Sequence, residues 1–400
     1  MENTITAIEL GTKKLKLVVG YELDGKVYSV YTMTKSFGDL QRSNGFLDFQ
    51  KLVETVSSIK EINDENARFS TKVNEAVVAL PADGLEIYQT IQRTTVVSEL
   101  GKIAPIDIKN LYMLIKNSCV KSSNMLVDIV PEKFTLDDGK TLNVNPIGEI
   151  SGGLTIHAKI HLSPEHIYKN YYGVFENAGI GVKRVVCAPL GAVEYLSTVE
   201  GLPNYYWLVD IGSDFCSVSL VGRDALFGAK YFNWGGDFLT KAISEKFNIS
   251  LEDAEKYKKI YGIDTREMNF RAPICTDEGG SVNKHFYKED LNEILYKGLD
   301  DFIELLKPSI EAITLKQRAD IHNELRKLPI VLIGGGSQLK GIADYLSGKV
   351  DNTDVRVVTP TVIGARDATY TNCLGMILAA KKYMSMNDDP RFRAGSITRD

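Results

Sequence analysis

The 400-residue sequence lacks several features that would point to particular classes of protein. No apolar run approaches the roughly 20 residues that a membrane-spanning helix needs. The beginning, MENTITAIELG, has neither the basic nor the apolar stretch of a secretory signal. Positive charge is not in excess, since 47 Lys and Arg stand against 52 Asp and Glu, for a net charge of −5. We therefore expect a cytoplasmic protein that does not bind nucleic acid.

Cysteine is also scarce, with five residues and no CxxC pair. This pattern predicts reduced thiols that fill the core rather than disulfides or a metal motif. His157 and His161 could suggest a metal pair, but the segment LTIHAKIHL alternates strictly between apolar and polar residues. The alternation favours a half-buried strand whose outer face, with His157, Lys159 and His161, is solvated.

What the sequence does contain is a pattern that occurs twice, about 200 residues apart. Near the start, TITAIELG predicts a strand that ends at Glu9 and is followed by Gly11. A second strand, an Asp24-Gly25 turn and a third strand complete a meander. The same order returns at YYWLVDIG, where Asp210 precedes Gly212, followed by CSVSLVG and ALFGAKYF. This repetition predicts two similar domains.

The second meander is followed by segments with helical spacing. A helix is predicted from about Asp237, with Phe238 on its apolar face, and Ser250 with Asp253 resembles a capping box that opens the next helix. Long helices are predicted over 285–325, where Pro308 begins or kinks a further helix. LPIVLIGGGSQLKGIADYL then predicts a strand, a glycine turn and a helix, so the fold class is α/β.

Three of these strand-end turns could converge on one ligand. Exposed backbone N–H groups at such turns bind anions, and glycine lets the backbone approach a phosphate closely. Glu9 and Asp210 could hold a hydrated Mg²⁺ ion, which prefers few carboxylates plus water and phosphate. Taken alone, a GGG run such as Gly334 to Gly336 also suits close packing. Neither GxGxxG nor the Walker pattern is present there.

The order of the three turns resembles that of actin-like ATPases, and the chain is similar to the bacterial FtsA cell-division family over nearly its whole length. The specific segments are DIVPEKFTLDDGKTLNVNPIGEISGGLTIHAKI, GIGVKRVVCAPLGAVEYL, AEKYKKIYG and IGARDATYTNCLGMI. The resemblance implies an actin-like, ribonuclease H-like fold of two domains, each with a β-meander core, and the family's 1C insertion.

The resemblance also implies four subdomains. Subdomain 1A would comprise 1–82 with 164–200 and 376–400, and subdomain 1C would be the insertion 83–163. Subdomain 2A would comprise 201–239 with 326–375, and subdomain 2B would be 240–325.

ATP would lie between the two halves, with Mg²⁺ held through water by Glu9 and Asp210. The nucleotide-binding residues implied are Gly11, Thr12, Lys14, Gly212, Ser213, Gly235, Gly236, Glu255, Lys258, Gly334, Gly335, Gly336 and Ser337. On the bare sequence Glu255 and Lys258 could equally be solvated helix charges. The chain has Glu9 where the family has Asp, and Ser213-Asp214-Phe215 where the family has a glycine- and threonine-rich loop. Because Asp214 would repel phosphate, we expect weak ATP binding and at most weak hydrolysis.

The implied function is a filament-forming scaffold that tethers the FtsZ ring to the inner face of the cytoplasmic membrane at the division site. Subdomain 2B would bind the FtsZ C-terminal tail, subdomain 1C would contact the next copy, and other division proteins would also bind. The family's C-terminal membrane hook is not evident in NDDPRFRAGSITRD. The alternatives are a scaffold for type IV pilus assembly or plasmid segregation, or a small-molecule kinase of the same superfamily.

Overall fold

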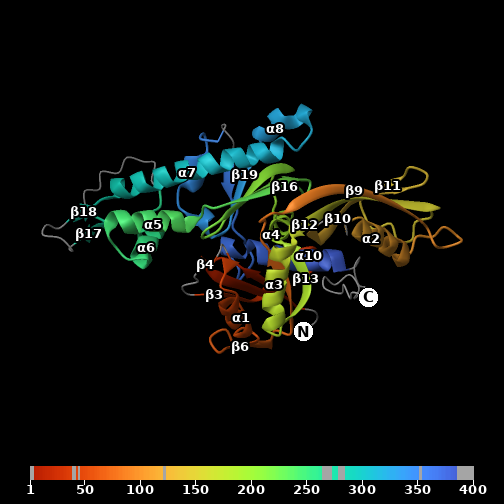
Figure 1. Cartoon of the computed structure of the whole chain (residues 1–400), viewed down its shortest axis with the longest axis horizontal. Coiled ribbons are helices and arrows are strands. Elements are labelled where there is room, and N and C mark those ends of the chain that lie inside the picture. The colour runs from red at the N-terminus through yellow and green to blue at the C-terminus, as the bar shows by residue number, and fades with distance from the viewer. Residues whose placement is uncertain are drawn as a thin grey trace.

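The computed structural model describes residues 4–37, 42–43, 46–119, 123–263, 273–277, 284–350 and 354–384. Two lobes face each other, and a third unit projects sideways from the first (Figure 1). Within the described residues, each of these three parts is built on a sheet of four or five strands.

The first lobe is built on a five-stranded sheet in the order β13-β8-β1-β2-β3. Its strands are β1 (Ile5–Leu10), β2 (Lys14–Leu23), β3 (Lys26–Ser36), β8 (Glu75–Leu80) and β13 (Gly181–Cys187). The predicted meander β1-β2-β3 is antiparallel, whereas β8 runs parallel to both β1 and β13. Asp24 and Gly25 form the β2–β3 turn with φ of 51° and 76°, as the hairpin motif requires.

Helices cover both faces of this sheet. Residues of α1 (Phe49–Ser57) and α3 (Glu165–Asn177) share one apolar cluster with β1 and β2. On the other face lie α4 (Ala188–Leu196) and α10 (Thr371–Met384). Short strands at the periphery are β4 (Arg42–Ser43), β5 (Phe46–Leu47), β6 (Glu61–Asp64) and β7 (Phe69–Lys72).

The second lobe repeats the topology of the first, with strand order β16-β15-β14-β19-β20. Its strands are β14 (Tyr205–Ile211), β15 (Cys216–Gly222), β16 (Ala225–Phe232), β19 (Ile330–Ile333) and β20 (Val355–Val357). Here too an antiparallel meander is followed by two parallel strands. The duplication predicted from the two strand–turn–glycine patterns is therefore confirmed.

A helical block extends from the second lobe (Figure 1). It contains α5 (Gly236–Phe247), α6 (Leu251–Tyr261), α7 (Lys288–Thr314) and α8 (His322–Arg326), with the ribbon β17 (Cys275–Asp277) and β18 (Lys284–Phe286). Ser250 caps α6 by accepting a hydrogen bond from the Asp253 amide, as predicted. The short helix α9 (Ile342–Leu346) follows the third glycine turn. In the part of the chain that the structure describes, no helix is both long and apolar enough to cross a membrane.

Two details of this block differ from the predictions. Pro308 does not begin a further helix, because α7 continues through it to Thr314; that it kinks the helix stays a prediction. An interior proline costs about 3 kcal/mol, and the buried residues Leu306 and Ile310 on either side of it offset that cost by packing into the core. Phe238 is exposed rather than on the apolar face of α5.

The projecting unit is a curved four-stranded sheet in the order β11-β10-β12-β9, with one helix against it. It comprises β9 (Glu86–Thr95), α2 (Pro105–Cys119), β10 (Asn124–Leu136), β11 (Thr141–Leu142) and β12 (Gly153–Pro164). These elements lie within the segment expected to form subdomain 1C, or extend just beyond it. The boundaries of all four subdomains stay predictions.

The strand β12 corrects one sequence interpretation. Its apolar face is buried as expected, but its polar face is not solvated, since Lys159 is 7% and His161 0% exposed. The Lys159 ammonium lies 3.9 Å from the centre of the Phe227 ring on β16 of the second lobe. His161 contacts Cys187 at the end of β13. Alternation identifies a strand with one apolar face, but it does not reveal that a second layer covers the polar face.

Candidate functional site

A cavity of about 580 Å³ lies between the two lobes, where the strand-end turns meet. The β1–β2 turn and the β14–β15 turn face each other across it, and α5, α6 and the turn after β19 complete its wall. Most of the residues selected from the sequence line this cavity: Glu9, Gly11, Thr12, Lys14, Asp210, Gly212, Ser213, Gly236, Glu255, Lys258, Gly335 and Gly336. Gly235, Gly334 and Ser337 do not line it.

The two strand-end turns have the same geometry. The Gly11 amide donates to the Lys14 carbonyl at 3.0 Å, and the Gly212 amide donates to the Phe215 carbonyl at 2.9 Å. A Cβ atom at either glycine would come within about 3 Å of the carbonyl oxygen that its amide contacts, at 3.0 and 2.9 Å respectively. Both turns therefore need glycine to close, and both present their backbone to the cavity.

The three selected residues that do not line the cavity support it by close packing. Gly334 has φ of 82°, and a Cβ atom there would lie 2.2 Å from Asp210 Oδ1. The buried Ser337 hydroxyl donates to the Gly334 carbonyl at 2.7 Å. A Cβ atom at Gly235 would lie 2.3 Å from the Ser213 carbonyl oxygen. The close-packing interpretation, left open for the GGG run, holds for its first glycine and also for Gly336, where a Cβ atom would lie 2.2 Å from Ile211 Cγ2.

The floor of the cavity is a network of charged side chains from both lobes. Lys16 Nζ contacts Glu9 Oε1 at 3.0 Å, and Asn372 Nδ2 donates to Asp210 Oδ2 at 2.9 Å. Burial raises the pKa of Glu9 despite the opposing charge of Lys16, and the nearby Asp210 carboxylate adds to this rise. The charges of Glu9 and Asp210 raise the pKa of Lys16 in spite of its burial.

The carboxylates of this floor can be compared with the ligands that the expected Mg²⁺ ion requires. Among the described residues, Glu9 Oε2 is a buried oxygen with no hydrogen-bond partner. Mg²⁺ is usually held by one or two carboxylates together with water and phosphate. The orphaned oxygen of Glu9 and the Asp210 carboxylate of the opposite lobe fit that requirement.

At the mouth of the cavity an ion pair joins the two lobes. Lys13, in the β1–β2 turn, contacts the Asp237 carboxylate in the first turn of α5. Lys13 is half-exposed, whereas Asp237 is largely covered. An entering anion would therefore meet an ammonium group already paired with a carboxylate of the second lobe.

The opposite wall is formed by α5 and α6. Lys258 Nζ donates to the Gly236 carbonyl at 2.8 Å and to Thr240 Oγ1 at 2.7 Å, while Thr240 Oγ1 donates to Glu255 Oε2 at 2.6 Å. Burial raises the pKa of Glu255, but the stronger combined effect of Lys258, Thr240 and Lys259 lowers it to about 2. Burial lowers the pKa of Lys258. These two residues are therefore part of the cavity wall and are not freely solvated helix charges.

The second turn also corrects an expectation. Phe215 lines the cavity but Asp214 does not, although the sequence suggested that the Asp214 carboxylate would face a bound phosphate. Phe215 stacks on Tyr231 of β16, with ring centres 4.8 Å apart. Asp214 lies between two residues that line the cavity, and weak ATP binding stays a prediction.

Known proteins were compared with this chain. The family model described as Cell division protein FtsA matches residues 207–375. A protein of that name from Enterococcus faecalis (strain ATCC 700802 / V583) is 24% identical over 377 residues, covering 92% of this chain and 82% of the relative. Another, from Buchnera aphidicola subsp. Baizongia pistaciae (strain Bp), is 25% identical over 397 residues, covering 95% and 91%. These matches support an FtsA-type protein.

Solved structures similar to this chain agree on the fold. A PilM–PilN type IV pilus biogenesis complex has a TM-score of 0.61 at 16% identity, covering 94% of this chain and 98% of that chain. MreB5 of Spiroplasma citri bound to AMPPNP has a TM-score of 0.54 at 13% identity, covering 97% and 98%. The predicted actin-like fold is confirmed.

Several charged residues of the cleft were not selected from the sequence. Lys13, Lys16, Asp237 and Asp367 all line the cavity. A signal for Lys16 was available, because the tight turn after β1 places Glu9 directly opposite Lys16 in the antiparallel register. No such local signal existed for Asp237, whose partner Lys13 lies in the other lobe.

Proposed function

We propose that this FtsA-type protein binds ATP with Mg²⁺ in the inter-lobe cavity and acts as a self-assembling scaffold in cell division. The observation that supports this most is the convergence of three strand-end turns from two duplicated sheets on one cavity of about 580 Å³. The volume lies within the range of roughly 300–1,000 Å³ found for small-molecule sites.

The phosphate end of the nucleotide would lie between the two glycine turns. Thr12 and Ser213 line the cavity, so their backbone N–H groups would donate to phosphate oxygens, and Lys14 would add positive charge. Mg²⁺ would be held by Glu9 and Asp210, mainly through water, and would neutralise phosphate charge when bound.

The nucleoside end would lie against α5 and α6. Glu255 is held ionised by Lys258, so it is suited to accept hydrogen bonds from hydroxyl groups such as those of a ribose. Gly335 and Gly336 leave room for a flat base. Hydrolysis is proposed to be slow or absent, since the second turn keeps the Ser213 hydroxyl but has Phe215 where the family has threonine.

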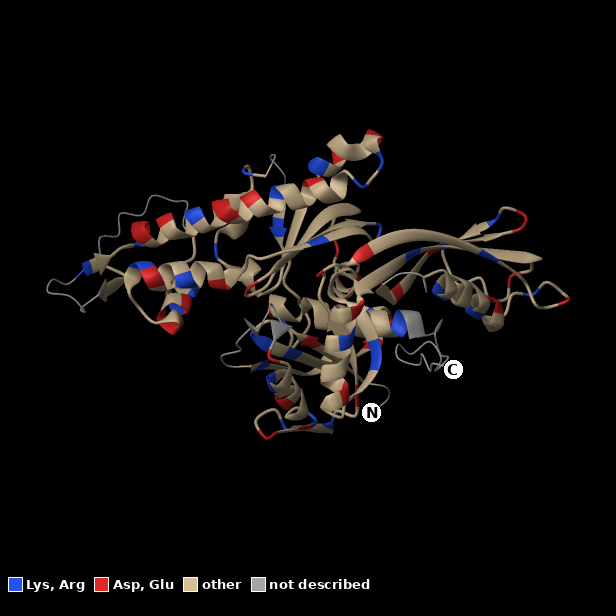
Figure 2. Cartoon of the chain, viewed as in Figure 1, with Lys and Arg blue, Asp and Glu red and all other residues tan. Residues whose placement is uncertain are grey.

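The proposed partners use surfaces away from the cleft. The helical block within 240–325 would bind the FtsZ C-terminal tail, since acidic and basic side chains alternate along α7 and could fix the register of an amphipathic segment (Figure 2). The projecting unit would contact the next copy in a filament through exposed apolar side chains such as Leu100, 85% exposed, and Ile150, 72% exposed. Other division proteins would join this assembly. The C-terminal segment in which the family's membrane hook is not evident lies outside the described residues.

Nucleotide binding can be tested with a matched pair of variants. Lys258→Met removes the ammonium that holds Glu255 and the Gly236 carbonyl, whereas Lys256→Met changes an exposed lysine on the same helix that does not line the cavity. We expect the first variant to weaken binding of a fluorescent ATP analogue by at least tenfold and the second to leave it unchanged. Equal affinity in both variants would contradict the proposed site.

The scaffold function has its own test. A synthetic FtsZ tail peptide should bind the full chain, and a scrambled peptide of the same composition should not. Sedimentation with ATP on lipid surfaces would report assembly. If the chain binds ATP but binds neither the tail peptide nor another copy, the proposed nucleotide site is supported and the proposed scaffold function is contradicted.

A further inference from the structure

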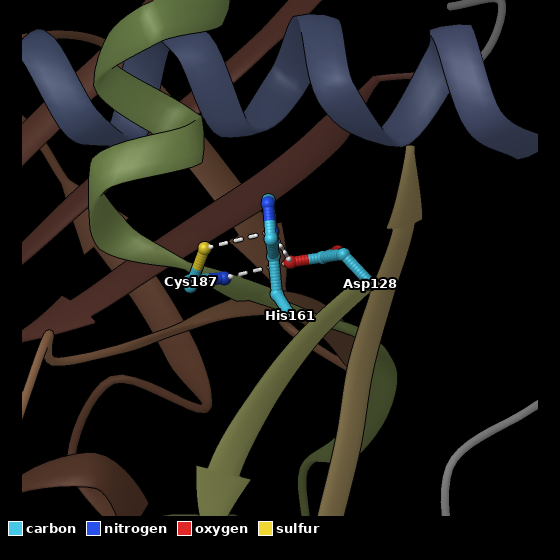
Figure 3. Close-up of side chains that lie close together, drawn as sticks. All are labelled: Asp128, His161 and Cys187. Carbon is cyan, nitrogen blue, oxygen red and sulfur yellow. Dashed lines mark hydrogen bonds and ion pairs between the residues drawn. The ribbon is translucent and has the colours of Figure 1, made fainter. Parts of the chain in front are cut away.

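Three potential metal ligands meet where the projecting sheet joins the first lobe, outside the inter-lobe cavity. Asp128 lies on β10, His161 lies opposite it on β12, and Cys187 ends β13. Their exposed fractions are 2%, 0% and 0%. Figure 3 shows the three side chains pointing toward one another, and all three potential ligand atoms lie within 4.8 Å of each other.

Ordinary hydrogen bonding does not account well for this arrangement. His161 Nδ1 is 3.5 Å from Asp128 Oδ2 and 3.4 Å from Cys187 Sγ. A hydrogen bond between a histidine and a carboxylate is normally about 2.7–3.2 Å long. The 3.4 Å contact with the Cys187 thiol is ordinary for sulfur, so the contact with Asp128 is the long one. The second ring nitrogen, Nε2, is buried with no partner among the described residues.

The same distances fit the edges of a metal coordination sphere. Zinc binds nitrogen and oxygen at about 2.0–2.2 Å and thiolate sulfur at about 2.3 Å in tetrahedral geometry. The ligand atoms of such a site are therefore about 3.3 Å apart for nitrogen and oxygen, and about 3.6 Å apart for nitrogen and sulfur. The observed separations, 3.5 and 3.4 Å, lie within about 0.2 Å of these values.

We propose that Asp128, His161 and Cys187 form a structural zinc site that fixes the projecting sheet to the first lobe. This proposal is independent of nucleotide binding. The chemistry suits zinc, because nitrogen, oxygen and thiolate ligands in a buried, roughly tetrahedral set are typical of this ion.

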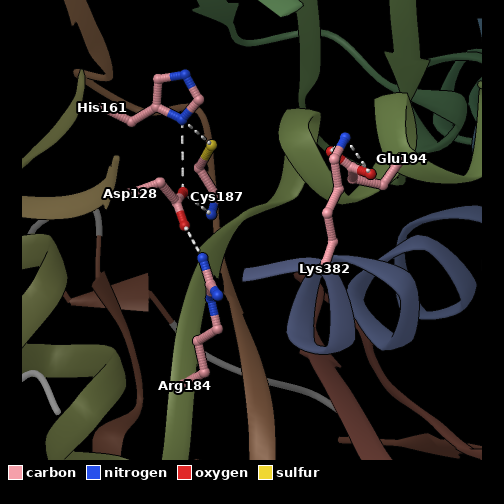
Figure 4. A network of polar contacts seen from close by, with 6 residues as sticks. All are labelled: Asp128, His161, Arg184, Cys187, Glu194 and Lys382. Carbon is pink, nitrogen blue, oxygen red and sulfur yellow. Dashed lines mark hydrogen bonds and ion pairs between the residues drawn. The ribbon is translucent and has the colours of Figure 1, made fainter. Parts of the chain in front are cut away.

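The surroundings of the three residues resemble the outer shell of a metal site. Arg184 donates to Asp128 Oδ1 at 3.2 Å, on the oxygen that does not face His161 (Figure 4). The Cys187 amide donates to Asp128 Oδ2 at 3.2 Å, which orients the carboxylate. Such second partners are usual for metal-bound carboxylates.

A fourth ligand would complete the tetrahedron. Two hydroxyl groups near the cluster are buried and have no partner in the described part of the chain. Ser163 lies on the same face of β12 as His161, and Tyr168 interacts electrostatically with Asp128. A water molecule held by these hydroxyls, or one of the hydroxyls itself, would occupy the remaining position.

The experiment measures metal in the full-length protein. Zinc would be quantified after purification without chelators, and the chelator-treated protein would be titrated with Co²⁺, which substitutes for zinc and absorbs visibly. We expect one metal per chain, a thiolate-to-cobalt charge-transfer band and intense d–d bands that indicate four ligands. Zinc should displace cobalt and raise the midpoint of thermal unfolding.

Single substitutions then identify which side chains bind the metal. Cys187→Ser should abolish the charge-transfer band, whereas Cys275→Ser, at another buried cysteine in β17, should leave it intact. Arg184→Gln should weaken affinity by about 10–100-fold, as expected for an outer-shell partner. If the unmodified protein binds neither zinc nor cobalt, or if its band persists in Cys187→Ser, the proposal is wrong and the cluster is a hydrogen-bonded joint only. The first of these results does not depend on whether any variant folds.

Discussion

The ion pair on the floor of the cleft leads to a prediction about stability. Lys16→Met keeps the length of the side chain but removes the charge that faces Glu9 at 3.0 Å. Both side chains are mostly covered, with exposed fractions of 17% and 13%. Removing one partner of a buried pair costs about 3–5 kcal/mol because the other charge is left uncompensated. For a domain of 150–250 residues each kcal/mol lowers the melting temperature by about 2–4 °C. A decrease of roughly 6–20 °C at neutral pH is therefore expected for Lys16→Met.

The loss of stability in Lys16→Met should become smaller as the pH falls. The pKa of Glu9 is already raised by burial, and removing Lys16 raises it further. The folded state of the variant then binds a proton more tightly than the unfolded state, so its stability increases as the pH falls from 7 toward the ordinary glutamate pKa of about 4.5. Thermal unfolding of the nucleotide-free protein at several pH values would measure this.

The matched control is Lys14→Met, which changes an exposed lysine on the same strand. Surface substitutions usually change stability by no more than about 0.5 kcal/mol. If Lys16→Met lowers the melting temperature no more than Lys14→Met does, and does so equally at all pH values, the assignment of a buried compensating charge is wrong.

Three further predictions concern packing, capping and titration. Gly375→Ala should prevent recovery of folded protein on gel filtration, because its Cβ atom would lie 1.6 Å from the Gly191 carbonyl oxygen of α4. Ser250→Ala should cost about 1 kcal/mol in thermal unfolding, since it removes the cap of α6. Glu255→Gln should be less stable than the parent at neutral pH. This difference should disappear as the pH falls from the ordinary value of 4.5 to about 2, where the parent loses the contribution of the ionised Glu255.

The parts of the fold that could be predicted from the sequence are those with local causes. The two meanders follow from alternating strands joined by turns such as Asp24-Gly25, whose residue types favour positive φ. The start of α6 follows from the Ser250 cap. Much of the cleft could also be predicted from the sequence, because Gly11 and Gly212 each follow a strand that ends in a carboxylate.

The remaining features depend on contacts between segments that are distant in the sequence. His161 is buried although it lies on the polar face of β12, where Cys187 at the end of β13 contacts it, and alternation alone cannot reveal this second layer. Pro308 is tolerated in α7 because core packing around it outweighs the lost hydrogen bond. Asp214 is not among the residues that line the cavity although its neighbours are, which residue order does not determine.

The contact between Lys159 and Phe227 has a mechanical consequence for the two lobes. The chain crosses between them twice, between Leu196 and Tyr205 and again between Val357 and Thr371. The Lys159 ammonium over the Phe227 ring, at 3.9 Å, joins them at a further point outside the cleft. Any motion of the lobes that moves β12 away from β16 must therefore separate this ammonium from the aromatic ring, whichever way the cleft itself opens.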